Sequence, residues 1–304
     1  MTSDFLDVDA LTPDRLAALL DRAQAWNKDP AAVPAALAGQ GVALLFEKPS
    51  SRTRTSTEMA VVGLGGHPIY IRPDEVGIGV RESVEDVART LAGYCTILAA
   101  RVFDHTTLEA MVAAVDVPVV NLLSDRAHPC QALADVLTLR EHLGSLEGRR
   151  VVFVGDGNNV AASLAFASAL CGIELTIASP PGYELDDDVV ERAGNLGGVV
   201  EVAVDPFEAV KGADAVYTDV WTSMGQEHES ESRRAAFRGY RVDADLMNAA
   251  GDQAVFLHCL PAHRGEEVTA DVIDGPASLV WQQAANRMDA VRALLADLAT
   301  GEDS

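Results

Sequence analysis

The chain has 304 residues, 48% of them hydrophobic and 23% charged, which suits a globular protein of two domains of about 150 residues each. Its formal net charge of −23 disfavours nucleic acid and anionic membranes as partners, because both would repel it. No run reaches the roughly 18 apolar residues of a membrane span, and the N-terminus lacks a signal-peptide pattern.

The four cysteines are widely spaced and form no Cys-x-x-Cys pair, so we expect reduced thiols and a cytoplasmic protein. Of the 23 basic residues only three are lysines, while the 46 acidic residues are spread along the whole chain. An acidic coat with so little lysine is typical of proteins from cells with molar internal salt. Salt at about 1 M shortens the range of charge repulsion to about 3 Å, and we therefore expect a halophilic protein.

The first half of the chain alternates between helical and strand-like patterns. A helix is expected at residues 12–26, with Thr12 as its N-cap and Pro13 at its first position. Strands are expected at residues 41–46, 67–71, 96–100 and 117–121. A long helix at residues 129–143 ends at Gly144.

The second half repeats this alternation, with strands expected at residues 150–154, 174–178, 199–202, 215–219 and 254–257. A terminal amphipathic helix covers residues 282–298. Such alternation predicts an α/β fold of two doubly wound parallel-sheet domains joined by long helices, with the active site in the interdomain cleft. We place the domains at residues 1–136 and 137–287, with the C-terminal helix 288–304 packing back on the first domain.

The first segment that carries chemistry is Phe-Glu-Lys-Pro-Ser-Ser-Arg-Thr-Arg-Thr-Ser at residues 46–56. It follows a buried strand and opens a helix, so free backbone N–H groups, hydroxyls and the guanidiniums of Arg52 and Arg54 meet at one point. These groups predict a phosphate site. The plainer alternative is a capped helix start with two solvent-exposed arginines. A Walker loop is excluded, because its glycines and lysine are absent.

The second segment is His128-Pro-Cys-Gln131, where the proline opens a helix and leaves the histidine at its N-terminus. The helix dipole disfavours the imidazolium there, so we expect a neutral histidine. A histidine that merely caps the helix is the alternative.

The third segment, Val-Gly-Asp-Gly-Asn-Asn-Val at residues 154–160, suggests a dinucleotide-binding turn. The third glycine is replaced by Val160, and the next strand ends in Ser179-Pro180 rather than an acidic residue. A turn that presents Asn158 and Asn159 to a ligand fits better.

Two further segments stand at the ends of expected strands, where open α/β sheets bind ligands. Asp219 precedes the loop Trp-Thr-Ser-Met-Gly, and a carboxylate there suits a cationic amine. His258-Cys259-Leu-Pro ends another strand; its thiol could be a nucleophile, a metal ligand or a polar contact, and no neighbouring base demands covalent catalysis.

Together these five segments resemble the aspartate/ornithine carbamoyltransferase family, in order and over nearly the whole chain. Ser-x-Arg-Thr-Arg and His-Pro-x-Gln are shared by the wider family. Asp-x-x-x-Ser-Met-Gly at residues 219–225 and His-Cys-Leu-Pro at residues 258–261 are similar to the ornithine branch.

The resemblance implies two sets of ligand-binding residues and no metal or organic cofactor. Carbamoyl phosphate would be bound by Ser50, Ser51, Arg52, Thr53, Arg101, His128, Gln131, Cys259, Leu260 and Arg287. Ornithine would be bound by Asn158, Asn159, Asp219, Ser223 and Met224. The catalytic residues would be Arg101, His128, Asp219 and Cys259. Gly77 replaces a glutamine that often reaches the phosphate from a neighbouring subunit, and Arg81 could supply another contact.

The implied reaction makes L-citrulline and phosphate from carbamoyl phosphate and L-ornithine, or runs backwards in arginine fermentation. The implied assembly is a homotrimer or a multiple of it. Three alternatives remain at this point: a carbamoyltransferase for another amine, an NAD-dependent dehydrogenase built on Gly155 and Gly157, and a two-lobed solute-binding protein.

Overall fold

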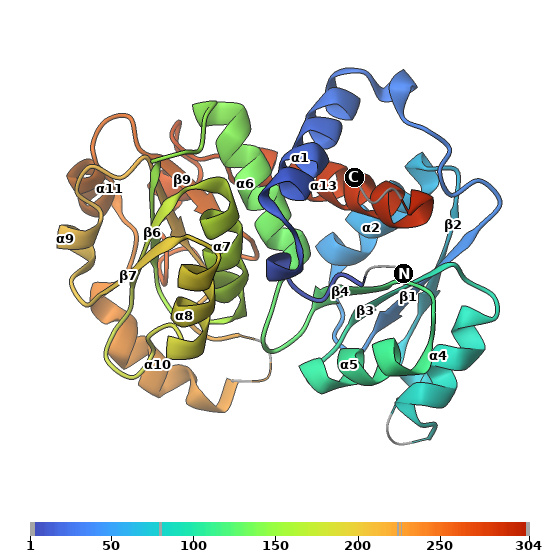
Figure 1. Cartoon of the computed structure of the whole chain (residues 1–304). Helices are drawn as coiled ribbons and strands as arrows, with labels where there is room; N and C mark the ends of the chain where they lie inside the picture. Colours follow the sequence, from blue (N-terminus) through green and yellow to red (C-terminus); the bar gives the residue numbers. More distant parts are fainter. Residues whose placement is uncertain (1–3, 79–80, 224, 226, 302–304) are drawn as a thin grey trace. The chain divides into compact units, whose positions relative to one another are not determined.

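The computed structural model describes residues 4–78, 81–223, 225 and 227–301, which form two compact units (Figure 1). Unit 1 comprises Met1–Leu137 and Ala285–Ser304, and unit 2 comprises Thr138–Ala284. The boundaries fall inside two helices, α6 (Pro129–Leu143) and α13 (Val280–Thr300). The second boundary precedes the expected one by three residues, which places Arg287 in unit 1.

Unit 1 contains a four-stranded parallel sheet in the order β2-β1-β3-β4. Its strands are β1 (Gly41–Phe46), β2 (His67–Ile71), β3 (Ile97–Arg101) and β4 (Val119–Leu123). Its helices are α1 (Pro13–Lys28), α2 (Ser51–Gly63), α3 (Pro73–Val76), α4 (Val84–Ala92) and α5 (His105–Ala114), besides parts of α6 and α13. The central strands β1 and β3 are apolar and buried over nearly their whole length, as expected of a sheet covered on both faces.

Unit 2 contains a five-stranded parallel sheet in the order β7-β6-β5-β8-β9. Its strands are β5 (Arg150–Val154), β6 (Glu174–Ala178), β7 (Val199–Ala203), β8 (Ala215–Thr218) and β9 (Val255–His258). Its helices are α7 (Asn159–Cys171), α8 (Asp187–Asn195), α9 (Pro206–Ala209), α10 (Ser230–Ala236), α11 (Ala244–Ala250) and α12 (Ala270–Ile273).

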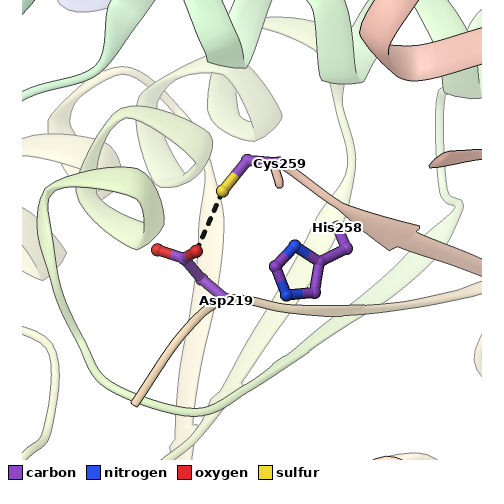
Figure 2. A group of neighbouring side chains, drawn as sticks. All are labelled: Asp219, His258 and Cys259. Carbon is purple, nitrogen blue, oxygen red and sulfur yellow. Dashed lines mark hydrogen bonds between the residues drawn. The ribbon is translucent and has the colours of Figure 1, made fainter. Parts of the chain in front are cut away.

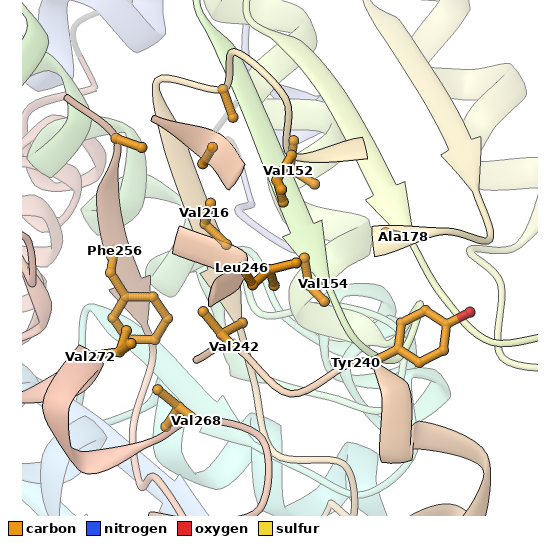
Figure 3. Packing of buried hydrophobic residues seen from close by; sticks show 14 of the residues in the cluster. Val152, Val154, Ala178, Val216, Tyr240, Val242, Leu246, Phe256, Val268 and Val272 are labelled. Atoms are coloured by element: carbon orange, nitrogen blue, oxygen red, sulfur yellow. The ribbon is translucent and has the colours of Figure 1, made fainter. Parts of the chain in front are cut away.

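The core of unit 2 follows the two-residue period of its strands. Val152 and Val154 of β5 pack with Val216 of β8, Phe256 of β9 and Leu246 of α11 (Figure 3). Each fully buried side chain of this kind contributes about 1.5–3 kcal/mol of transfer free energy. This packing fixes the strands whose carboxyl ends carry the candidate site.

The fold predicted from the sequence is confirmed: both units are parallel α/β sheets with crossover helices. Thr12 caps α1 as expected, because its hydroxyl accepts a hydrogen bond from the Arg15 N–H at 3.2 Å. β4 begins two residues later than predicted. Pro118 has no N–H to donate, and the first strand residue with one is Val119. Among the described helices, none is both long and apolar enough to cross a membrane.

Each sheet has a point where the chain reverses its direction of travel across the sheet. In unit 1 it lies between β1 and β3, and in unit 2 between β5 and β8. Loops after neighbouring strands diverge at such a point and leave a crevice at the carboxyl ends, where open α/β sheets bind ligands. The topology alone therefore predicts one ligand site in each unit.

Candidate active site

The site in unit 1 is built on the start of α2, directly after β1. Ser50 is the N-cap: its Oγ accepts a hydrogen bond from the Thr53 N–H at 3.3 Å and donates to Thr53 Oγ1 at 3.1 Å. The remaining N–H groups of this first turn point outward with the positive end of the helix dipole. Such a helix start binds anions without further adaptation.

Two buried arginines converge on the Thr53 hydroxyl. Arg101, the last residue of β3, donates from Nη1 at 3.4 Å, and Arg287 of α13 donates from Nη2 at 2.8 Å. The three residues are between 1% and 5% exposed. Two guanidiniums this close together repel each other in a poorly hydrated site, so they favour a ligand of multiple negative charge.

The two arginines of the Ser-x-Arg-Thr-Arg segment have different environments. Arg54 pairs with Glu58 at 2.8 Å and lies over the ring of Tyr70 at 3.7 Å. Arg52 is half-buried and makes no hydrogen bond or ion pair with any residue that the structure describes. Arg54 is thus engaged by Glu58 and Tyr70 within the chain, whereas the guanidinium of Arg52 has no described partner.

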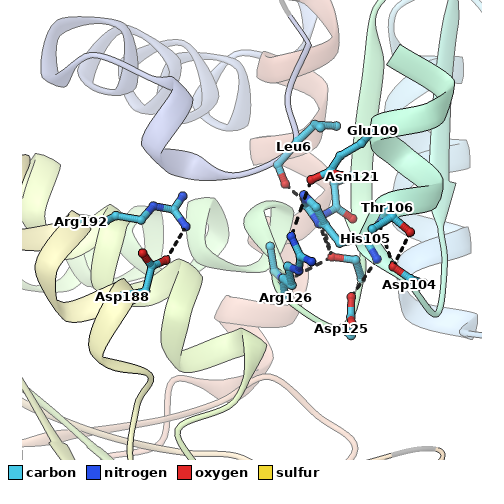
Figure 4. A network of polar contacts seen from close by, with 12 residues as sticks. Leu6, Asp104, His105, Thr106, Glu109, Asn121, Asp125, Arg126, Asp188 and Arg192 are labelled. Atoms are coloured by element: carbon cyan, nitrogen blue, oxygen red, sulfur yellow. Dashed lines mark hydrogen bonds and ion pairs between the residues drawn. The ribbon is translucent and has the colours of Figure 1, made fainter. Parts of the chain in front are cut away.

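His128 is held at the start of α6 by a fixed turn. Its carbonyl accepts from the N–H groups of Gln131 and Ala132 at 3.0 and 3.2 Å. The preceding turn is anchored by Asn121, which donates to the Leu6 carbonyl, and by Asp125, which accepts from the His105 N–H (Figure 4). His128 and all of these contacts belong to unit 1.

Burial lowers the pKa of His128 well below 6.5, and the positive charges of Arg287 and Arg101 lower it further. The expectation of a neutral histidine is borne out, but burial is the largest cause, not the helix dipole. Gln131 lies on the same turn and donates from Nε2 to Asp135 Oδ1 at 2.8 Å. Its Oε1 is buried and has no hydrogen-bond partner among the described residues, so it can accept from a ligand N–H.

The site in unit 2 centres on Asp219, which follows β8 directly and is 7% exposed. Its Oδ1 accepts from Cys259 Sγ at 2.9 Å, and Figure 2 shows the two side chains pointing toward each other. Its Oδ2 accepts from Asn158 Nδ2 at 3.0 Å. Asn158 also caps α7, accepting from the N–H groups of Val160 and Ala161. Asp219 is thus a fixed, buried carboxylate between the ends of β5 and β9.

His258, the residue before Cys259, stabilises the turn at residues 258–260 that positions the Cys259 thiol. Its Nδ1 accepts from the Leu260 N–H at 2.9 Å, so the hydrogen of the neutral ring is on Nε2, which lies 3.2 Å from Glu267 Oε1. Leu260 has a φ of 59°, rare for a bulky residue, and the Leu260–Pro261 peptide is cis. The sequence analysis missed Glu267, because no spacing rule links an acid nine residues downstream to this histidine.

Among the residues that the structure describes, two groups of side chains have donor atoms close enough together to ligate a metal ion. Donor atoms of Asp219, His258 and Cys259 lie within 4.8 Å of one another, as do those of His263, Glu266 and Glu267. In the first group, both ring nitrogens of His258 are already occupied by Leu260 and Glu267. His258 therefore has no free ring nitrogen for a metal ion.

The dinucleotide interpretation conflicts with the environment of Gly157. A Cβ atom on this residue would overlap the backbone of Glu184 and Leu185. The Gly157 N–H also donates to the Tyr183 carbonyl at 2.8 Å. This glycine is required for close packing against the loop after β6, so it is no evidence of a pyrophosphate site.

The remaining expected site residues lie in or beside these two sites. Asn159 is the first residue of α7, and Ser223 is half-buried in the loop after Asp219. Met224 lies outside the described residues. Arg81 Nη1 donates to the Glu75 carbonyl of its own chain at 3.3 Å, and Gly77 is the left-handed cap of α3 with a φ of 62°.

Comparison with known proteins gives the family. The model of the aspartate/ornithine carbamoyltransferase carbamoyl-P binding domain matches residues 3–141, and that of the Asp/Orn binding domain matches residues 147–298. The chain belongs to the aspartate/ornithine carbamoyltransferase family. The first range matches the N-terminal part of unit 1, and the second covers residues 147–284 of unit 2 together with residues 285–298 of α13, which belong to unit 1.

Individual relatives are similar over almost their full length. The ornithine carbamoyltransferase of Acidothermus cellulolyticus is 50% identical, covering 98% of this chain and 97% of the relative. That of Haloquadratum walsbyi is 46% identical, covering 98% of each. The solved ornithine carbamoyltransferase of Pyrococcus furiosus is 44% identical with a TM-score of 0.94, covering 100% of this chain and 98% of that one.

Proposed function

We propose that this chain transfers the carbamoyl group of carbamoyl phosphate to the side-chain amine of L-ornithine, giving L-citrulline and phosphate in arginine metabolism. The observation that carries the proposal is the buried carboxylate of Asp219, held between Cys259 and Asn158 at the switch point of unit 2. This is a site for a cationic amine. The full-length similarity to ornithine carbamoyltransferases supports the same substrate.

Unit 1 is the proposed carbamoyl phosphate-binding domain. Its phosphate would bind at the start of α2 through Ser50, Ser51, Arg52 and Thr53, with Arg101 and Arg287 beside it. Neutral His128 can donate one hydrogen bond to the carbamoyl oxygen, and Gln131 Oε1 can accept from the carbamoyl amide. Cys259 and Leu260 would contact the same group when both substrates are bound.

Unit 2 is the proposed ornithine-binding domain, using Asn158, Asn159, Asp219, Ser223 and Met224. A free side-chain ammonium has a pKa near about 10.4, so binding must help it lose a proton before attack. Asp219 and Cys259 accept hydrogen bonds from the amine and direct its lone pair at the carbonyl carbon.

The amine nitrogen then bonds to the carbonyl carbon, and Arg101, His128 and Thr53 stabilise the oxyanion that forms. The bond between the carbonyl carbon and the phosphate oxygen breaks as the carbonyl re-forms. Phosphate departs toward Arg52 and the helix start, and it can accept the proton released by the amine. The same groups serve the reverse reaction in arginine fermentation.

The test is citrulline formation by the purified protein from carbamoyl phosphate and L-ornithine. Putrescine, N-acetyl-L-ornithine and L-aspartate serve as competing acceptors under identical conditions. We expect product only with L-ornithine. Faster turnover of any other acceptor would contradict the proposed substrate.

The protein is also proposed to self-associate as a trimer or a multiple of trimers. Unit 1 exposes Met59 and Val62 on α2 and Ile69 on β2, the edge strand of the sheet. Such apolar groups beside an unpaired edge are typical of a surface covered by another copy. Sedimentation of the wild type and of Met59→Glu tests this, and a wild-type monomer at micromolar concentration would contradict it.

A cytoplasmic location and a halophilic origin complete the proposal. The four cysteines are free thiols, in keeping with a reducing compartment. The net charge of −23 and the scarcity of lysine support adaptation to high salt.

A further inference from the structure

Arg233 of α10 is a buried arginine that the sequence gives no reason to notice. It is 6% exposed, although neighbouring Arg234 lies on the surface. α10 follows the loop that carries Ser223, a proposed ornithine ligand.

The guanidinium of Arg233 joins segments that are far apart in the chain. Nη1 donates to Asp156 Oδ2 at 2.6 Å and to the Trp221 carbonyl at 3.2 Å. Nε donates to Glu229 Oε2 at 3.0 Å, and the guanidinium carbon lies 5.0 Å from the ring centre of Tyr183.

Two of these contacts reach the segments that hold the proposed ornithine ligands. Asp156 stands two residues before Asn158, on the turn after β5. Trp221 stands midway between Asp219 and Ser223. The third contact, Glu229, lies just beyond the same loop, so Arg233 holds residues 221 and 229 on either side of Ser223 against the turn after β5.

That turn is itself a rigid support. The Gly157 N–H is bonded to the Tyr183 carbonyl, and Gly157 packs so closely on residues 184–185 that no Cβ fits. The Gly155 carbonyl accepts from Ser179 Oγ at 2.6 Å. Arg233 bonds to the loop of residues 219–229 at the Trp221 carbonyl and at Glu229, and its bond to Asp156 ties that loop to this turn.

The positive charge of Arg233 also acts on the carboxylates around it. Burial raises the pKa of Asp156, the charge of Arg233 lowers it, and Asp219 and Glu229 raise it again. Three carboxylates therefore share this region, and Arg233 offsets their repulsion.

We propose that Arg233 is a positioning residue for ornithine: it holds the loop of Asp219 and Ser223 on the turn of Asn158, so that the ligands form one site before the substrate arrives. This inference rests on the proposed ornithine site. It predicts a loss confined to the amino-acid substrate, since the residues that Arg233 contacts, Asp156, Tyr183, Trp221 and Glu229, all belong to unit 2.

The test compares Arg233→Gln and Arg233→Lys with the control Arg234→Gln, whose arginine pairs with Glu266 on the surface at 2.9 Å. KM for ornithine and kcat are measured at saturating carbamoyl phosphate, and calorimetry gives the Kd of carbamoyl phosphate. For Arg233→Gln we expect KM for ornithine to rise about 20-fold or more, with kcat within about threefold and the Kd within about twofold. Arg233→Lys keeps the positive charge but loses the planar guanidinium with its several donors, so its KM for ornithine should lie between those of the wild type and Arg233→Gln. Arg234→Gln should match the wild type.

Asp156→Asn weakens the shortest hydrogen bond of Arg233 and leaves its bonds to Glu229 and Trp221 in place. This variant is the substitute test if Arg233→Gln does not fold. It should raise KM for ornithine about fivefold. An unchanged KM in folded Arg233→Gln, or in Asp156→Asn, would overturn the inference. Equal losses of ornithine and carbamoyl phosphate binding would also overturn it, because they indicate general destabilisation.

Asp219→Asn, measured in parallel, separates this inference from the proposed site. If Asp219→Asn impairs ornithine use and Arg233→Gln does not, the site stands and the positioning role is wrong. If neither variant affects ornithine, both are wrong.

Discussion

Replacing Asp219 by asparagine changes one charge in the proposed ornithine site and almost nothing in volume. In the wild type, Oδ1 accepts from Cys259 and Oδ2 from Asn158. Asparagine has one acceptor and one donor group, so its NH₂ must face either the thiol or the Asn158 NH₂. One buried hydrogen bond is lost, and the negative charge that attracts the amine is lost with it.

The size of the effect follows from these two losses. A hydrogen bond to a charged group contributes about 1.5–3 kcal/mol, which corresponds to roughly 10- to 150-fold in kcat/KM for ornithine. The lost internal bond should lower the free energy of unfolding by about 1 kcal/mol. Carbamoyl phosphate affinity should stay within about twofold, because the residues proposed to hold its phosphate belong to unit 1.

The assay is citrulline formation with ornithine varied at saturating carbamoyl phosphate, together with calorimetric titration of carbamoyl phosphate alone. Asp214→Asn is the matched control: Asp214 precedes the same strand, β8, and pairs with Arg149 at 2.8 Å, away from the carboxyl end. The control should keep its kcat/KM for ornithine. Wild-type kcat/KM in Asp219→Asn, or equal losses in both variants, would refute the assignment of Asp219.

Three further predictions concern unit 1 and the whole chain. Arg52→Ala should weaken carbamoyl phosphate binding about 10- to 100-fold by calorimetry while Arg54→Ala does not, because Arg54 is engaged by Glu58; equal losses would contradict this. The folded-state pKa of His128 lies below 6.5, so the unfolded chain binds one more proton there as the pH falls below 6.5. Urea unfolding should therefore show this site lowering the free energy of unfolding by about 1.4 kcal/mol per pH unit below that point, and His128→Asn should abolish that slope. With a net charge of −23, melting temperature and assembled mass should rise between about 0.05 and 3 M KCl, and flat profiles would contradict the halophilic interpretation.

Much of the fold could be predicted because its elements obey local rules. The strand at residues 41–46 is an uninterrupted apolar run, and Pro129 and Gly144 mark the two ends of α6. The least local feature is the division of α13 between the two units, which the structure places after residue 284 and the sequence analysis after residue 287. The sequence of a continuous amphipathic helix does not show at which residue it stops packing on one unit and begins packing on the other.

The environments within the sites were predicted less well than the residues themselves. Arg52 and Arg54 are equivalent in the sequence, but only the structure shows that Arg54 is engaged by Glu58 and Tyr70. The neutral state of His128 was expected from its position at a helix start. Its main cause, burial beside two arginines, depends on the folding of Arg101 and Arg287 around it.

The difference between what could and could not be predicted has a physical origin. A residue proposed to touch substrate, such as Asp219 or Thr53, must have a particular chemical type at a particular strand or helix end, so its surroundings in the sequence are constrained. A residue that supports it, such as Glu267 beneath Cys259 or Arg233 beside Asp156, needs only to reach its partner through space. Many positions in the chain could place a side chain within reach of the same partner, so the residues on either side of a supporting residue do not reveal its role. Variants of these supporting residues should therefore alter the affinity of one substrate without abolishing the chemistry.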